Sequence, residues 1–256
     1  MKTKLKRIAF IPARGGSTGV PCKNIRILNG KALICHTVDF ALSQNFFESV
    51  LISTDNAEIA QIACNFQLSA NEFHDLEQNQ VVAISDRTYL HRRLDSQAET
   101  LSPIREVLFD FAKRNDEFSN FDYLIMLQPT SPYRNPRDLE EISKLIKNRP
   151  EWTSIASFTS VGGLHPDRMY RKRINGLFEP FIGQNNADNK PRQLLEELFI
   201  KDGAYYVFKR ELLQNRVLMG DLVKPLYRQG LGTINIDTEQ DFLIASLVGD
   251  LFIQQS

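Results

Sequence analysis

The first strand-like segment of the chain runs directly into a glycine-rich loop that carries two cations. Residues 8–11 form an apolar run typical of a buried strand, and residues 12–24 hold three glycines, two prolines, Arg14 and Lys23. Glycines let a backbone turn its N–H groups toward a ligand, and the cations suit a polyphosphate. A strand feeding such a loop is typical of nucleotide binding at the carboxyl edge of a parallel sheet. The loop matches neither a P-loop nor GxGxxG, so a plain glycine-rich turn stays the alternative.

The composition excludes several classes of partner. The 256 residues include 31 basic and 31 acidic side chains, so no global positive field is available for DNA, although a local basic pocket remains compatible. No apolar run approaches the roughly 20 residues that span a bilayer, and the basic start lacks a long enough apolar run for a signal peptide. Three cysteines without metal spacing indicate reduced thiols. We therefore expect a cytoplasmic protein without nucleic-acid or membrane partners.

Hydrophobic periodicity after the loop predicts alternating helices and strands. Such alternation predicts right-handed βαβ units, and hence an α/β fold with a mostly parallel sheet flanked by helices. The pattern predicts helices over 31–44, 57–66, 102–114 and 136–146, and strands over 49–55, 81–84, 122–127 and 153–158.

The pattern changes after about residue 160. Asn175-Gly176 lies between alternating segments within 169–178, which predicts a hairpin with a tight turn. We interpret residues 160–195 as an arm inserted into a single domain of residues 1–256, reaching over the site or onto a second subunit. Further on, the pattern predicts strands over 203–208 and 233–236, and a helix over 238–253 that buries Leu243, Ile244, Leu247, Val248 and Leu251.

A family resemblance covers nearly the whole chain, and two stretches are its most specific matches. Ala13-Arg14-Gly15-Gly16-Ser17 with Pro21-Cys22-Lys23-Asn24 resembles the loop that wraps the phosphates of CTP in the CMP-sialic acid synthetase family, whose members activate sialic, legionaminic and pseudaminic acids. Gln128-Pro129-Thr130-Ser131-Pro132 resembles the family's second signature. The resemblance implies a Rossmann-like fold of the nucleotide-diphospho-sugar transferase type, a homodimer joined through a small arm, and a role in lipopolysaccharide or capsule biosynthesis. Thr18 departs from the family, which usually has Lys there.

The resemblance also implies the residues of the site. Arg14, Lys23 and Asp237 are implied to be catalytic. Gln128, Arg168, Arg192 and Tyr206 are implied to bind the sugar, and Asp202 near the last of these replaces the family's usual Asn. The implied nucleotide-binding residues are Ala13, Arg14, Gly15, Ser17, Lys23 and Asn24, with Arg92 and Ser102 receiving the base and a phosphate.

A magnesium site is expected beside the expected strand 233–236. Alternation along that strand places Asn235 and Asp237 on the same face, whereas the alternative is that Asp237 merely starts the last helix. In the family two aspartates of this stretch hold Mg²⁺, and here Asn235 replaces the first. An amide offers an oxygen to the metal but no charge.

The resemblance implies a cytidylyltransferase that joins CTP to a nine-carbon 2-keto acid sugar and releases pyrophosphate. Two alternatives stay open. A weakened relative would bind nucleotide or sugar without efficient turnover, because Thr18 and Asn235 each remove a charge from the site. A CMP-Kdo-type synthetase would use the same fold for another sugar. The sequence does not distinguish the nine-carbon acceptors from one another.

Overall fold

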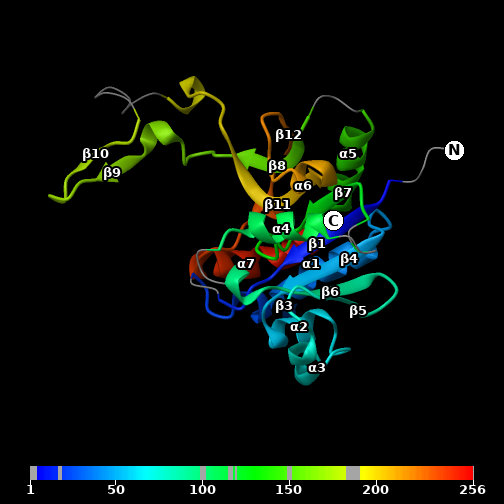
Figure 1. Cartoon of the computed structure of the whole chain (residues 1–256). Helices are drawn as coiled ribbons and strands as arrows, with labels where there is room; N and C mark the ends of the chain where they lie inside the picture. The colour runs from blue at the N-terminus through cyan, green and yellow to red at the C-terminus, as the bar shows by residue number, and fades with distance from the viewer. Residues whose placement is uncertain are drawn as a thin grey trace.

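The computed structural model describes residues 5–16, 19–98, 102–114, 118, 120–148, 152–182 and 191–255. In this part of the chain an eight-stranded sheet of order β12-β8-β11-β7-β1-β4-β6-β5 forms the centre (Figure 1). Its strands are β1 (Arg7–Pro12), β4 (Ser49–Thr54), β5 (Val81–Ala83), β6 (Thr88–Arg92), β7 (Tyr123–Met126), β8 (Ser154–Ser160), β11 (Phe199–Lys209) and β12 (Val223–Tyr227).

The central strands run parallel, as the sequence predicts. Strand β1 pairs in parallel with β4 and β7, β4 pairs in parallel with β6, and β12 with β8. Within this eight-stranded sheet, antiparallel pairing is confined to β11 and to the edge strand β5. Residues 8–11 of β1 are all buried, because helices cover both faces of the sheet.

Helices pack on both faces of this sheet. Helices α1 (Leu33–Ser43), α2 (Ala57–Ala63), α3 (Ala70–Asp75) and α5 (Pro136–Lys147) join the core that contains Ala9 and Ile11. Helices α4 (Ile104–Lys113) and α6 (Arg210–Gln214) join the opposite core, with Ile8 and Phe10. The remaining short elements are β2 (Ile27–Leu28), β3 (Lys31–Ala32), and 3-10 helices at Lys23–Ile25, Asp95–Gln97, Pro166–Arg168, Arg192–Leu194 and Leu231–Thr233.

Two expectations about strands need correction. The segment expected as strand 233–236 belongs to no sheet: a 3-10 helix covers Leu231–Thr233, and the Ile236 N–H donates to the Thr130 carbonyl. Strand β12 was not among the expected strands; it contains Pro225 and lies at the sheet edge, where a missing N–H donor is tolerated.

The last helix, α7 (Glu239–Gln255), is less buried than its sequence predicts. Phe242 and Ala245 pack against Val20 and Tyr133, whereas Leu243, Leu247 and Leu251 are 59%, 69% and 50% exposed. The apolar residues spread around more of the helix than one packed face can cover. Among the described helices none is long and apolar enough to cross a membrane.

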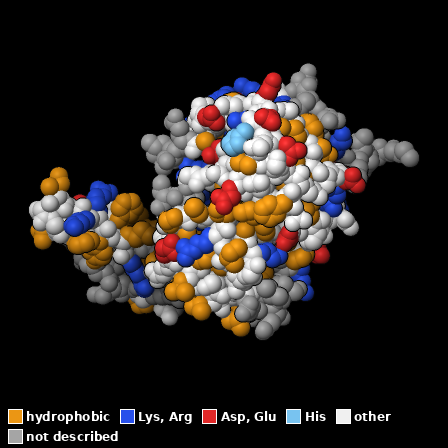
Figure 2. Space-filling model, turned by 90° about the horizontal axis from the view of Figure 1, so that it is seen from below, with side chains coloured by type: hydrophobic (Ala, Val, Ile, Leu, Met, Phe, Trp, Pro, Cys, Tyr) orange, Lys and Arg blue, Asp and Glu red, His pale blue; other side chains and the backbone are white. Residues whose placement is uncertain are grey.

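The expected hairpin forms and stands away from the sheet (Figure 1). Its strands β9 (Tyr170–Lys172) and β10 (Phe178–Pro180) pair antiparallel. At the turn, Gly176 has φ +84°, and the Leu177 N–H donates to Asn175 Oδ1 over 3.1 Å. Hydrophobic side chains gather on this projection (Figure 2), including Ile174, Leu177 and Phe178, all of which are exposed.

Candidate active site

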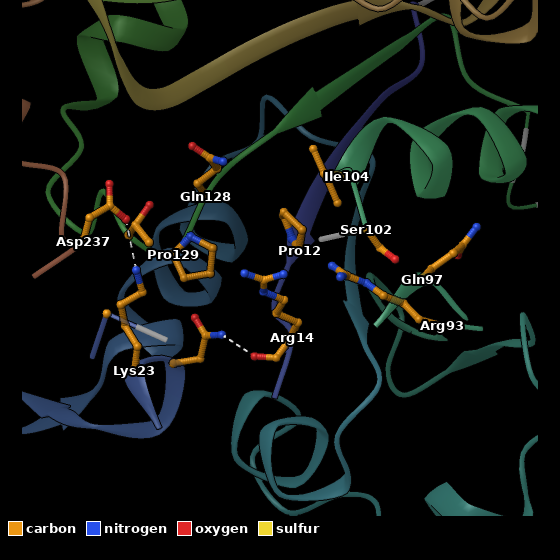
Figure 3. Close-up of a pocket in the computed structure, with 13 residues that line it drawn as sticks. Pro12, Arg14, Lys23, Arg93, Gln97, Ser102, Ile104, Gln128, Pro129 and Asp237 are labelled. Atoms are coloured by element: carbon orange, nitrogen blue, oxygen red, sulfur yellow. Dashed lines mark hydrogen bonds and ion pairs between the residues drawn. The ribbon is translucent and has the colours of Figure 1, made fainter. Parts of the chain in front are cut away.

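A cavity of about 540 Å³ opens where β1 and β7 end (Figure 3). Three cationic side chains line it, Arg14, Lys23 and Arg93, and they face a single described carboxylate in the lining, that of Asp237. An excess of cations in a concave site attracts anionic ligands. The other lining residues are Pro12, Gly19, Asn24, Gln97, Ser102, Ile104, Gln128, Pro129 and Thr130.

The loop after β1 is held in place by side chains from its own stretch and from β4. Asn24 Nδ2 donates to the Arg14 carbonyl over 3.0 Å, and the Gly15 N–H donates to Asp55 Oδ1 over 3.1 Å. The Ala13 N–H donates to the Ser53 carbonyl. The backbone at Ala13, Arg14 and Gly15 is therefore held before any ligand arrives, which lowers the entropy cost of binding one.

Gly19 brings this loop against the start of α7. A Cβ atom added to Gly19 would lie 2.1 Å from the carbonyl oxygen of Asp237. Because that oxygen belongs to the backbone, it cannot move aside as the end of a flexible side chain can. The close approach of the two segments therefore requires glycine at this position.

We expect Gly19→Ala to lower kcat/KM for CTP by at least about tenfold, because the methyl group pushes the loop away from Asp237. Gly16→Ala is the matched control, since a Cβ at Gly16 meets no atom within 4 Å. Steady-state kinetics of both variants check this. Equal activity of the two variants would contradict the structural role of Gly19.

Lys23 links the loop to Asp237. Its Nζ donates to the Ile236 carbonyl over 2.7 Å and lies 3.1 Å from Asp237 Oδ1. Asn235 Nδ2 donates to Asp237 Oδ2 over 3.0 Å, so these two side chains meet although no strand aligns them. The Lys23 side chain is 13% exposed and that of Asp237 is 67% exposed, which leaves the carboxylate accessible at the rim of the cavity.

The side chains at Asp237 suit a metal ion that takes most of its ligands from a bound substrate. No group of three His, Cys, Asp or Glu side chains among the described residues is placed to hold a metal. Asn235 turns its amide nitrogen to Asp237, while its oxygen accepts from Ser131 Oγ over 3.4 Å. Mg²⁺ is often bound through one or two carboxylates plus phosphate oxygens, and Asp237 supplies one carboxylate.

Of the two adjacent arginines at the end of β6, Arg93 and not Arg92 reaches the cavity. The Arg92 guanidinium donates to the carbonyls of His74 and Leu76, and lies over the Phe73 ring. Arg93 lines the cavity and is 3% exposed. Its Nε donates to Ser53 Oγ over 2.9 Å, whereas its buried Nη2 has no hydrogen-bond partner among the described residues.

This corrects the expectation for Arg92, and the reason is the pleat of β6. Successive residues at the end of a strand point to opposite sides, so only one of two adjacent arginines can face the cavity. Burial lowers the pKa of Arg93 to about 10, and the guanidinium still carries its charge at neutral pH. The two adjacent arginines, Arg92 and Arg93, were the sequence signal for this part of the site. Because the strand before them was not expected, the sequence did not indicate which of the two faces the cavity.

Ser102 lines the cavity and lies two residues before the first residue of α4. Pro103 occupies the N-cap position, and Ser102 Oγ donates to the Ser96 carbonyl over 2.8 Å. Gln97, which the sequence did not single out, also lines the cavity and donates to Asp110 Oδ2 over 2.6 Å. Gln128, which the family resemblance implies to bind the sugar, lies in the lining of the cavity.

Three implied sugar-binding residues lie outside the described lining of the cavity. Arg168 and Arg192 lie in the 3-10 helices Pro166–Arg168 and Arg192–Leu194, at the base of the arm. Tyr206 lies in β11, where its ring stacks with Phe208 and burial raises the pKa of its hydroxyl. Ser17 and Thr18 lie outside the described residues.

Comparisons with known proteins find cytidylyltransferases. A family model described as cytidylyltransferase matches residues 8–84, which include the loop after β1. CMP-N,N'-diacetyllegionaminic acid synthase of Legionella pneumophila is 27% identical over 96% of this chain and 97% of its own length. The chain is thus similar over nearly its whole length to a member of the CMP-sialic acid synthetase family. Together with the cytidylyltransferase model this indicates a nucleotidyltransferase, and the cavity is its candidate active site.

Some of the similar proteins are longer than this chain. N-acylneuraminate cytidylyltransferase A of Danio rerio is 29% identical over 93% of this chain but only 49% of its own length. A solved CMP:2-keto-3-deoxy-manno-octonic acid synthetase, complexed with CTP, covers 98% of this chain and is itself covered completely, with a TM-score of 0.61 and 18% identity. The latter likeness confirms the expected nucleotidyltransferase fold.

Proposed function

We propose that the chain transfers the cytidylyl group of CTP to a nine-carbon 2-keto acid sugar of the sialic, legionaminic or pseudaminic acid type. The observation that carries this proposal is the convergence of Arg14, Lys23 and Arg93 on one cavity beside the carboxylate of Asp237. The negative charge of a triphosphate would neutralise these three cations. The names of the similar proteins indicate that they act on sugars of this class.

The proposed reaction is a displacement at the α-phosphorus of CTP. The anomeric hydroxyl of the sugar forms a new oxygen–phosphorus bond, and the bond to the β-phosphate breaks to release pyrophosphate. Arg14, Lys23 and Arg93 bind the phosphates and stabilise the charge that develops on them. The proposed acceptor of the hydroxyl proton is a phosphate oxygen of CTP or water, and no histidine lines the described part of the cavity.

We propose Mg²⁺ as the cofactor, held by Asp237 together with phosphate oxygens. When bound, the ion neutralises charge on the transferred phosphate. Lys23 fixes the Asp237 carboxylate from the loop side, and Asn235 fixes its second oxygen. The side chains therefore orient the carboxylate before substrate binds.

The proposed acceptor site needs a second copy of the chain. Gln128 lies in the cavity and is proposed to contact the sugar, whereas Arg168 and Arg192 lie at the base of the arm. We propose a homodimer in which the arm of one protomer brings these arginines to the sugar carboxylate of the other. The exposed apolar side chains of the arm, such as Leu177 and Phe178, support this proposal.

We also propose a cytoplasmic location. Cys22, Cys35 and Cys64 are all free thiols, the form that a reducing compartment maintains.

The proposed function is tested by pyrophosphate release from CTP and Mg²⁺ with a panel of acceptors. The panel holds sialic, legionaminic and pseudaminic acids together with Kdo. We expect release with one of the nine-carbon sugars, which would also identify the acceptor. Release with Kdo alone would overturn the choice of sugar. If no acceptor in the panel gives pyrophosphate release while calorimetry still detects CTP binding, the result would instead support a relative that binds nucleotide without turnover.

A further inference from the structure

A buried histidine lies directly behind Arg93. His91 is 1% exposed, and both of its ring nitrogens have partners. Nε2 lies 2.9 Å from Asn79 Oδ1, and Nδ1 lies 3.0 Å from Ser53 Oγ. Because the amide oxygen of Asn79 can only accept, Nε2 carries the proton of the ring. Nδ1 is then an acceptor and takes the hydroxyl hydrogen of Ser53.

The same hydroxyl accepts from Arg93. Arg93 Nε donates to Ser53 Oγ over 2.9 Å, so the hydrogen bonds run in one direction, from Arg93 through Ser53 and His91 to Asn79. Each group has one orientation that satisfies its neighbours. This arrangement holds the Nε side of the guanidinium and leaves the buried Nη2 of Arg93 unpartnered among the described residues.

The end of this series is anchored to the sheet edge. The Asn79 N–H donates to the Arg92 carbonyl over 2.7 Å, and the Asn79 carbonyl accepts from Arg114. Burial, together with the charges of Arg93 and Arg114, lowers the pKa of His91 to about 3. The imidazole is therefore neutral at physiological pH and keeps Nδ1 as an acceptor.

A nearby carboxylate also attracts the Arg93 guanidinium, and the hydrogen bond at Nε opposes a turn of the guanidinium toward it. The carboxylate of Asp55 attracts its guanidinium, and Arg14 repels it. Asp55 already accepts from the Gly15 N–H of the phosphate loop. A guanidinium that turned to Asp55 would be withdrawn from the ligand, so holding its Nε in place preserves a donor for an anion in the cavity.

We propose that Asn79, His91 and Ser53 are positioning residues that aim the Arg93 guanidinium at the phosphates of the bound nucleotide. This inference rests on the proposed function, because it requires CTP in the cavity. None of the three residues is needed to touch the nucleotide: their effect passes through Arg93.

The test measures CTP binding by calorimetry in His91 variants. His91→Phe keeps a ring beside Phe111, whose centroid lies 5.8 Å from that of His91, but removes the acceptor for Ser53. We expect its Kd for CTP to rise about tenfold. His91→Asn restores an acceptor close to the position of Nδ1, and we expect it to recover most of the affinity.

A double-mutant cycle separates positioning from general structural damage. In an Arg93→Met background, His91→Phe should leave the Kd for CTP unchanged, because no guanidinium remains to be aimed. Phe111→Leu is the packing control and should lower the melting temperature without changing that Kd. An undiminished effect of His91→Phe in the Arg93→Met background would overturn the inference.

The result also separates this inference from the proposed function. If the wild-type protein binds no CTP, both fail. If Arg93→Met weakens CTP binding while His91→Phe leaves the Kd unchanged, the nucleotide site stands and the positioning role of His91 does not.

Discussion

Replacing Asp202 by alanine is expected to lower the free energy of unfolding by about 3–5 kcal/mol. The Asp202 side chain is fully buried, and its Oδ2 accepts from Arg228 Nη1 over 2.6 Å. Its Oδ1 accepts from Ser157 Oγ and from the Ala204 N–H. Removing the carboxylate leaves a buried guanidinium with half of its countercharge and a buried N–H without its acceptor.

Arg228 keeps other hydrogen-bond partners when the Asp202 carboxylate is removed, and these partners limit the loss of stability. Arg228 Nε donates to Asp138 Oδ2 over 2.9 Å, and Nη2 donates to the Tyr133 carbonyl over 2.8 Å. Asp202→Asn restores the residue usual in the family and keeps an oxygen for Ser157 and Ala204. We therefore expect the asparagine variant to lose less stability than the alanine variant.

Urea denaturation of both variants checks this prediction. An alanine variant within about 1 kcal/mol of the wild type would show that Asp138 alone compensates Arg228. The same measurement bears on the active site, because Ser131 Oγ donates to the Asp202 carbonyl and so ties the loop after β7 to this buried pair.

The loop after β1 could be predicted because its signals are local. Arg14, Lys23 and Asn24 lie within ten residues of one another, and glycines among them indicate a loop. The structure brings all three to one cavity. The residue types within this one short stretch were therefore sufficient to predict this half of the site.

The rest of the site depends on contacts that are distant in sequence. Arg228, which the sequence did not single out, is buried where Asp138 and Asp202 converge on it from 90 and 26 residues away. Arg93 was missed for a related reason. Strand β6 buries the polar side chain of His91, so it lacks the alternation that reveals a half-buried strand.

Replacing Asp237 by asparagine is expected to lower kcat by about 10²–10³-fold, the range found when a charge-stabilising group is removed from an active site. Asp237 supplies the carboxylate in the described lining of the cavity and accepts from both Lys23 and Asn235. The asparagine variant keeps the shape of the side chain but removes the charge proposed to hold Mg²⁺. The measurement is kcat at saturating CTP and Mg²⁺.

Glu239→Gln is the matched control, because Glu239 lies two residues away at the start of α7 and pairs with Arg26 at 2.5 Å outside the cavity lining. Its kcat should stay within about twofold of the wild type, since exposed ion pairs contribute little. Calorimetry with CTP in the presence of EDTA should show binding by Asp237→Asn at least as tight as by the wild type, because a negative charge near the phosphates is gone. A kcat near that of the wild type would place the metal elsewhere, and weaker binding without metal would mean that Asp237 acts through Lys23 and the loop instead.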